Sequence, residues 1–78
     1  MLPKNIPLNS LKKGQAGKIV QIKSQGDLGR RIRDMGLVVG MPVTILGRAP
    51  MGDPLALRVA ETTLALRKHE AESILVSF

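Results

Sequence analysis

Cysteine is absent from this sequence, and its only aromatic residue is a phenylalanine at the carboxyl terminus, Phe78. Without cysteine, the fold has no disulfide bonds and no thiolate metal ligands. Without tryptophan or tyrosine, the core must be built from aliphatic side chains, and 44% of the residues are hydrophobic. We therefore expect one small domain over residues 1–78 whose stability rests on aliphatic packing.

Long hydrophobic runs are also missing. No run approaches the roughly 20 residues that cross a bilayer, and the first five residues lack the apolar stretch of a secretory signal. Together with the absence of cysteine, this predicts a cytoplasmic protein with no direct insertion into the membrane.

Acidic residues are scarce, since six Asp and Glu stand against twelve Lys and Arg, which gives a net charge of +6. Such a charge favours nucleic acid, an anionic membrane surface or an acidic protein face as partner. Barrels that bind single strands combine positive charge with aromatic side chains for stacking, and this chain offers only Phe78. Sequence-specific nucleic-acid binding is therefore disfavoured, and a basic barrel that attracts nucleic acid is kept as the alternative function.

Residues for catalysis or metal binding are equally few. The only histidine, His69, has no visible partner and is expected to be an exposed surface residue. The one cluster of His and carboxylates, His69 with Glu70 and Glu72, falls on a predicted helical turn, where neighbouring side chains diverge. We assign no catalytic residue, no cofactor and no metal ligand, and predict that the chain is not an enzyme.

A glycine-containing segment, Gly26-Asp27-Leu28-Gly29-Arg30, opens a predicted helix, whose first backbone amides could bind an anion. The segment lacks the Lys-Ser/Thr ending of a P-loop and the full glycine pattern of a dinucleotide fold. Asp27 can itself cap the same amides, so capping is the favoured interpretation.

The same helix has Leu28, Ile32 and Met35 at i, i+4 and i+7, on one face. Gly36 then stands where a left-handed C-cap glycine belongs. A second, single helical turn is expected at residues 68–73, with Ala71 as its buried contact.

The rest of the chain is patterned mostly for β-structure. Five short strands are predicted at residues 16–24, 42–46, 55–59, 63–67 and 74–76. In the first of them, adjacent β-branched residues at Ile19-Val20 predict a bend or bulge. Five strands with one helix after the first and a helical turn before the last close most economically as a small barrel, so the predicted fold class is mainly β.

Residues 1–13 are expected to be irregular, because Pro3 and Pro7 interrupt regular structure. The spacing of Leu8 and Leu11 suits one helical turn that ends at Gly14. In the favoured interpretation, this segment is an ordered tail that packs both leucines onto the barrel.

The segment 49–54 is rich in turn formers and predicts a hairpin loop. Met51 stands at its tip, where an adaptable apolar side chain is hard to bury within the same domain. Two interpretations of this tip stay open: a protein contact, and the favoured one, a tip folded back onto the barrel. The helix residues Ile32 and Met35 are favoured as core residues, but they border any groove beneath the helix. The candidate partner-binding residues are Ile32, Met35, Pro50, Met51, Gly52 and Asp53.

Four segments, in this order and spacing, resemble a known family. They are Leu8-x-x-Leu11-x-x-Gly14-x-x-Gly17-x-Ile19, Arg31-Ile32-x-x-Met35-Gly36-Leu37-x-x-Gly40, Ala49-Pro50-Met51-Gly52-Asp53-Pro54-Leu55 and Leu64-Ala65-Leu66-Arg67-Lys68-x-Glu70-Ala71-x-x-Ile74-x-Val76. Together they cover nearly the whole chain, and in these segments the chain resembles the FeoA family.

The resemblance implies an SH3-like barrel, in agreement with the strand count. It implies a small cytoplasmic accessory protein of ferrous iron uptake, which binds the GTPase-bearing cytoplasmic part of the FeoB transporter and modulates its assembly or activity. At the family level it carries an association with transition-metal ions, but no catalytic residues. Similar domains occur in iron- or manganese-responsive repressors; since no helix-turn-helix precedes the domain in this sequence, we expect the transport role. Barrel edges can pair between copies, so a weak homo-oligomer is a further expectation.

Overall fold

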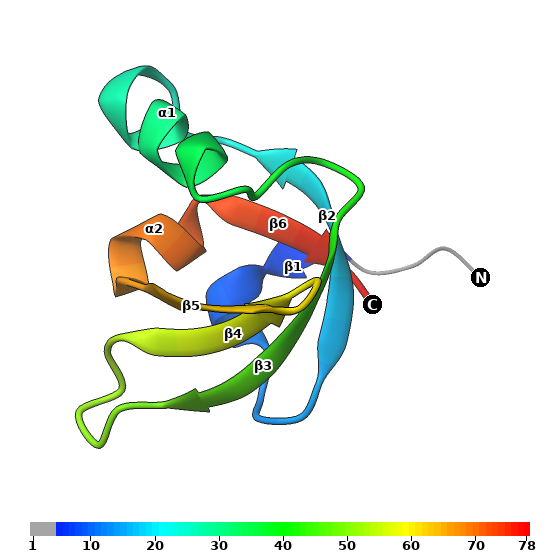
Figure 1. Cartoon of the computed structure of the whole chain (residues 1–78), viewed down its shortest axis with the longest axis vertical. Coiled ribbons are helices and arrows are strands. Elements are labelled where there is room, and N and C mark those ends of the chain that lie inside the picture. Colours follow the sequence, from blue (N-terminus) through cyan, green and yellow to red (C-terminus); the bar gives the residue numbers. More distant parts are fainter. Residues whose placement is uncertain (1–4) are drawn as a thin grey trace.

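Six antiparallel strands form one sheet in the order β1-β6-β2-β3-β4-β5 (Figure 1). The structure is a computed structural model that describes residues 5–78. The strands are β1 (Asn5–Pro7), β2 (Ala16–Ile22), β3 (Pro42–Arg48), β4 (Leu55–Val59), β5 (Thr62–Leu66) and β6 (Ile74–Ser77). The helical elements are the 3-10 turn η1 (Leu8–Ser10), α1 (Gly26–Asp34) and α2 (Lys68–Glu72). The sheet and its two short helices agree with the mainly β fold predicted from the sequence.

The first strand was not predicted, so the count of five strands is wrong by one. β1 pairs with β6, with Asn5 opposite Ser77 and Pro7 opposite Leu75. Proline is tolerated here because β1 lies at the edge of the sheet, where a missing N–H costs little. The expectation of an irregular conformation around Pro3 lies outside the described residues.

The two leucines after β1 confirm the expected ordered tail, because Leu8 and Leu11 are both fully buried. Leu11 N–H donates to the carbonyl of Leu8 at 3.1 Å, which closes the single turn of η1. From the end of β3, the Arg48 guanidinium donates to Asn9 Oδ1 at 2.7 Å and to the carbonyl of Leu11 at 2.8 Å. These long-range contacts hold the turn against the barrel.

The bulge predicted in the first long strand is present. The pairing of β2 with β6 shifts register between Ile19 and Gln21. Ile19 is fully buried and Val20 is half-buried, so the two adjacent β-branched residues both pack. The strand ends at Ile22, two residues earlier than expected.

Helix α1 has the predicted apolar face but not the predicted N-cap. The N-cap is Gln25, without a side-chain hydrogen bond, and Asp27 lies in the first turn. The helix therefore begins at Gly26, two residues before Leu28, which would be the first helical residue if Asp27 were the N-cap. Gly26 has φ +66°, a left-handed conformation that favours glycine. Inside the first turn, the negative carboxylate of Asp27 still stabilises the helix, because it lies near the positive end of the helix dipole. The C-terminal prediction is confirmed, because Gly36 has φ +96° and donates to the carbonyl of Arg33 at 2.9 Å.

The core is aliphatic, as the composition requires. It consists of Leu8, Leu11, Ile19, Ile32, Leu37, Val43, Ile45, Leu55, Leu57, Val59, Leu66, Ala71, Ile74 and Val76. Helix α1 contributes Ile32 and helix α2 contributes Ala71, and the two helices lie next to each other on one side of the barrel (Figure 1). No helix among residues 5–78 combines the length and hydrophobicity of a membrane-spanning segment.

Candidate functional site

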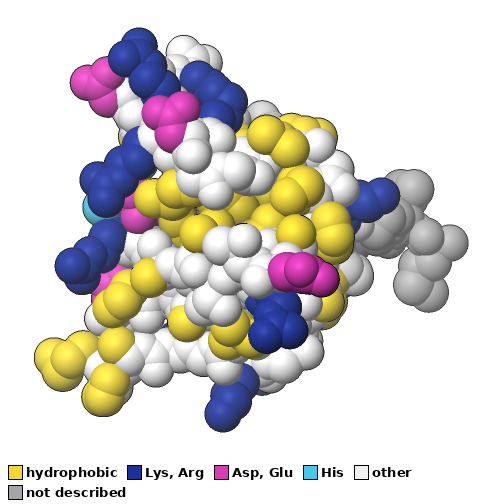
Figure 2. Space-filling view, in the orientation of Figure 1, with side chains coloured by type: hydrophobic (Ala, Val, Ile, Leu, Met, Phe, Trp, Pro, Cys, Tyr) yellow, Lys and Arg dark blue, Asp and Glu magenta, His cyan; other side chains and the backbone are white. Residues whose placement is uncertain are grey.

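The loop between β3 and β4 carries four of the six candidate residues, Pro50–Asp53, and is here called the Met51 tip. Gly52, at φ +85°, donates to the carbonyl of Ala49 at 2.7 Å, and Ala49 donates to the carbonyl of Pro54 at 3.1 Å. This tight turn leaves Met51 91% exposed. Figure 2 shows hydrophobic side chains standing out from the end of the hairpin. The favoured expectation, a tip folded back onto the barrel, is therefore wrong.

Asp53 has a different role from its neighbours in the Met51 tip. Its Oδ1 accepts the backbone N–H of Lys68 at 2.8 Å, and its Oδ2 lies 3.8 Å from the Arg67 guanidinium. Its half-buried side chain is thus committed to the start of α2. Asp53 therefore fixes the orientation of the hairpin, while Met51 is the side chain available to a partner.

The two candidate residues of α1 are packed within the domain. Ile32 is fully buried, and Met35 is half-buried against the core. Ile32 has no surface left for a partner in this conformation and instead anchors α1. Of the candidate residues, the structure therefore brings only Pro50, Met51 and Gly52 fully to the surface.

A second exposed apolar site, the valine turn, consists of Val38 and Val39 between α1 and β3. These side chains are 46% and 62% exposed. Among the partly buried residues that pack against the core are Leu28, Met35, Met41 and Leu64. Figure 2 shows a hydrophobic band between α1 and the β4–β5 hairpin, continuous across this face. The sequence signal for the valine turn was two adjacent valines between Gly36 and Gly40, because a tight turn cannot bury both.

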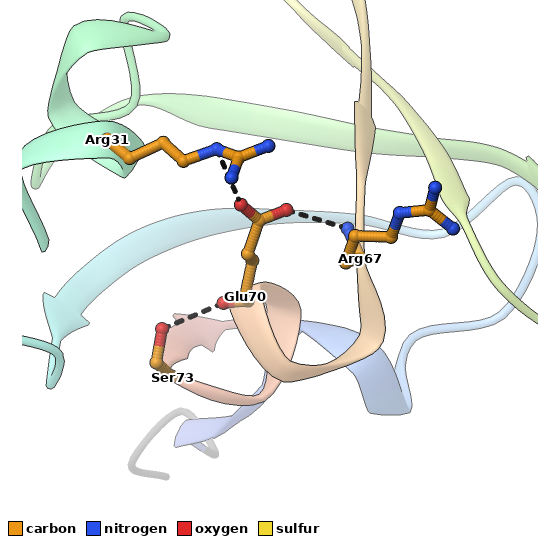
Figure 3. A network of polar contacts seen from close by, with 4 residues as sticks. All are labelled: Arg31, Arg67, Glu70 and Ser73. Carbon is orange, nitrogen blue, oxygen red and sulfur yellow. Dashed lines mark hydrogen bonds and ion pairs between the residues drawn. The ribbon is translucent and has the colours of Figure 1, made fainter. Parts of the chain in front are cut away.

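Glu70 is the buried charge that the sequence analysis missed. Its side chain is 1% exposed, and its Oε1 accepts the backbone N–H of Arg67 at 2.8 Å (Figure 3). Its Oε2 lies 3.1 Å from Arg31 Nε, an ion-pair contact without the alignment of a hydrogen bond. The Glu at the third helical position, reaching back to the residue before the helix, is half of a capping box. The sequence did not show it, because Arg67 stands where that pattern has Ser or Thr.

This arrangement does not gather metal ligands. His69 and Glu72 are exposed on α2, whereas Glu70 turns into the domain toward Arg31. No group of three His, Cys, Asp or Glu side chains within residues 5–78 is placed to hold a metal ion. The part of the chain that the structure describes also encloses no pocket.

The remaining charged positions lie on the surface. The arginines of α1 and the lysines at positions 12, 13, 18 and 23 are all exposed. In the segment Gly26–Arg30, Gly29 is buried because α1 approaches the carbonyl of Ser24 closely. The site is thus a surface with two apolar elements, the Met51 tip and the valine turn, on a molecule whose basic side chains are exposed.

Comparison with known families gives one decisive match, because the FeoA domain profile covers residues 6–77. The chain belongs to the FeoA family. It is 45% identical to a FeoA-like protein from Clostridium acetobutylicum, whose structure it matches with a TM-score of 0.87 over 94% of this chain and 85% of that one.

A Stenotrophomonas maltophilia FeoA, solved in complex with zinc and described as a prokaryotic SH3-domain protein, is 29% identical. Its TM-score is 0.76, over 88% of this FeoA-family chain and 86% of that one. This likeness supports the SH3-like description of the barrel. A fusion of Fe(2+) transport protein A and the transporter FeoB from Porphyromonas gingivalis is 33% identical over 67 residues, which are 86% of this chain and 8% of the fusion protein. The family thereby ties the chain to ferrous iron transport, and none of these relatives is named as an enzyme.

Proposed function

We propose that this chain is a cytoplasmic accessory protein of ferrous iron uptake that binds the cytoplasmic, GTPase-bearing part of a FeoB-type transporter. The observation that carries the proposal is the Porphyromonas gingivalis protein, in which a domain similar to this chain is joined to FeoB in a single polypeptide. Binding modulates the assembly or activity of the transporter and recruits the chain to the inner face of the membrane.

The Met51 tip is the contact surface that the geometry supports best. A methionine that is 91% exposed contributes nothing to the core of its own domain, and its flexible thioether adapts to an apolar pocket on a partner. Asp53 holds the tip in one orientation, so little side-chain and loop freedom is lost on binding.

The partner is tested by titrating the transporter's cytoplasmic domain with this chain, in both the GTP- and GDP-bound states, at about 0.1 M ionic strength. Saturable binding in at least one nucleotide state is expected. If neither state binds, the proposed function is wrong.

The contact surface is tested by Met51→Asp, with Met51→Leu as the matched apolar control. We expect M51D to weaken binding by about tenfold or more, as for a buried anchor residue, and M51L to bind like the wild type. Thermal unfolding of both variants should be unchanged, because Met51 makes no core contact. Equal binding by M51D and the wild type would leave the partner in place and overturn the assignment to the tip.

A further inference from the structure

Strand β5 is a sheet edge without the usual protection against pairing. The sheet order places β5 at one end, with β4 on one side and no strand on the other among residues 5–78 (Figure 1). Its sequence, Thr62–Leu66, contains neither a charged residue nor proline, the two commonest means of blocking an edge. The opposite edge, β1, is three residues long and ends in proline.

The register of the β4–β5 hairpin shows which backbone groups of β5 are free. Val59 and Thr62 face each other across the two-residue turn, so they form a hydrogen-bonded pair, and alternation gives the next such pair to Leu57 and Leu64. The N–H and C=O groups of Thr63 and Ala65 therefore point away from β4. Both residues are exposed, so these groups face solvent.

The free stretch ends at Arg67. The N–H of Arg67, which continues the alternation from Thr63 and Ala65, donates to Glu70 Oε1 at 2.8 Å. Its carbonyl accepts the N–H groups of Glu70 and Ala71, both at 3.0 Å. Helix α2 thus saturates the backbone at this end and leaves Thr63 and Ala65 as a short, defined pairing site.

We propose that this site pairs with the same site of a second copy of the chain, so that two β5 strands run antiparallel about a two-fold axis at Leu64. In this register, Thr63 of one copy faces Ala65 of the other, and each of these two residue pairs exchanges two backbone hydrogen bonds. The result is a symmetric contact between identical surfaces.

Charge complementarity selects a second copy as the occupant. Glu61 lies three residues before Leu64 and Arg67 three residues after it, and both are exposed. Continuing this register past the strand ends brings Glu61 of each copy, in the turn before β5, alongside Arg67 of the other. Directly opposed side chains of unlike charge stabilise such a pair, and like charges destabilise it. The Arg67 guanidinium, with a 61% exposed side chain and only a 3.8 Å contact to Asp53, is free to make this contact.

The interface is small, so the association is weak, with a dissociation constant on the order of 100 µM. Each copy also carries a net charge of +6, whose repulsion is largely screened at about 0.15 M ionic strength. The contact does not use Met51, and it holds whether or not the chain binds a transporter.

The test uses the full chain, with sedimentation equilibrium and amide NMR from about 10 µM to about 2 mM, a range that brackets the expected dissociation constant. A monomer–dimer equilibrium is expected, with concentration-dependent shifts concentrated at the amides of Thr63 and Ala65. E61R and R67E should each weaken association by about tenfold, because each sets like charges opposite one another.

Mixing the two variants decides whether the register is correct. A heterodimer of E61R with R67E again sets opposite charges face to face at both ends, so the mixture should associate about as well as the wild type. D34R and K18E, which make the same changes in net charge at exposed positions of α1 and β2, should behave like the wild type.

Three results would overturn the proposal. The first is a wild-type chain that stays monomeric at about 2 mM, some twentyfold above the expected dissociation constant. The second is charge variants that associate like the wild type, or fail to recover on mixing. The third is a response of the Thr63 and Ala65 amides only when a transporter domain is added, which would assign the edge to another protein. M51D should self-associate normally, so the outcome is separable from that of the proposed function.

Discussion

At the scale of single residues, position 29 shows how one close contact reverses an expectation from sequence. Gly29 in a helix reads as a small cost, because alanine is the better helix former. In the structure, Gly29 is where α1 approaches the preceding loop, and a Cβ there would lie 2.5 Å from the carbonyl oxygen of Ser24. The backbone would have to shift to admit it, so glycine is required by packing.

We therefore predict that Gly29→Ala lowers the free energy of unfolding by up to about 2 kcal/mol. Helix propensity favours alanine by about 1 kcal/mol, whereas overpacking of this kind costs about 1–3 kcal/mol. Urea unfolding measures the difference, with Arg30→Ala as a control at an exposed position of the same helix, expected to change stability by less than about 0.5 kcal/mol. A Gly29→Ala variant more stable than the wild type would contradict this prediction, because it would show that the loop at Ser24 moves away at little energetic cost.

At the scale of elements, the contact between α1 and α2 rests on an ion pair that is buried on one side only. Glu70 is 1% exposed, whereas the Arg31 side chain is 66% exposed. Removing Arg31 leaves a buried carboxylate without its counter-charge, which is more costly than replacing both partners.

The expected result is that Arg31→Ala destabilises the domain by about 1–2 kcal/mol, less than a fully buried pair would lose, because water reaches the arginine. Adding Glu70→Gln to Arg31→Ala should recover part of this loss, because the neutral side chain can still accept the N–H of Arg67. A double-mutant cycle by thermal unfolding measures the coupling. Additive effects would mean that the two side chains do not interact in solution.

Local patterns predicted the elements that depend on nearby residues. The β3–β4 hairpin followed from its turn formers, and the C-terminal end of α1 from Gly36. The strand β1 was not predicted, because its partner β6 lies at the other end of the chain and Pro7 is unfavourable for strand pairing. The burial of Glu70 was not predicted either, because it depends on a contact between α1 and α2, which are far apart in the sequence.

The candidate site was predicted in part. Met51 was identified because a hairpin tip exposes whatever stands there, and that exposure is confirmed. The inclusion of Ile32 reflected its place on the helix, but the apolar face of α1 turns fully inward at that residue. Asp53 was included as part of the loop, and its hydrogen bond to Lys68 could not be seen in the sequence.

At the scale of the whole molecule, the net charge of +6 implies attraction to any polyanion. We expect weak retention on a heparin or DNA column at about 50 mM salt that is lost by about 200 mM, because each phosphate contact releases a counterion. A column gradient and a gel shift measure this. Tight, saturable binding of one nucleic acid near 150 mM salt, the physiological range, would instead favour the alternative of a nucleic-acid-binding barrel.

Asp53, Arg67, Glu70 and Arg31 form a relay of polar contacts from the hairpin loop, through the start of α2, to α1. The hairpin loop and α1 are therefore linked to each other through the start of α2. A ligand that moves the hairpin loop would therefore also disturb the Glu70 carboxylate, which accepts the N–H of Arg67 at the start of α2.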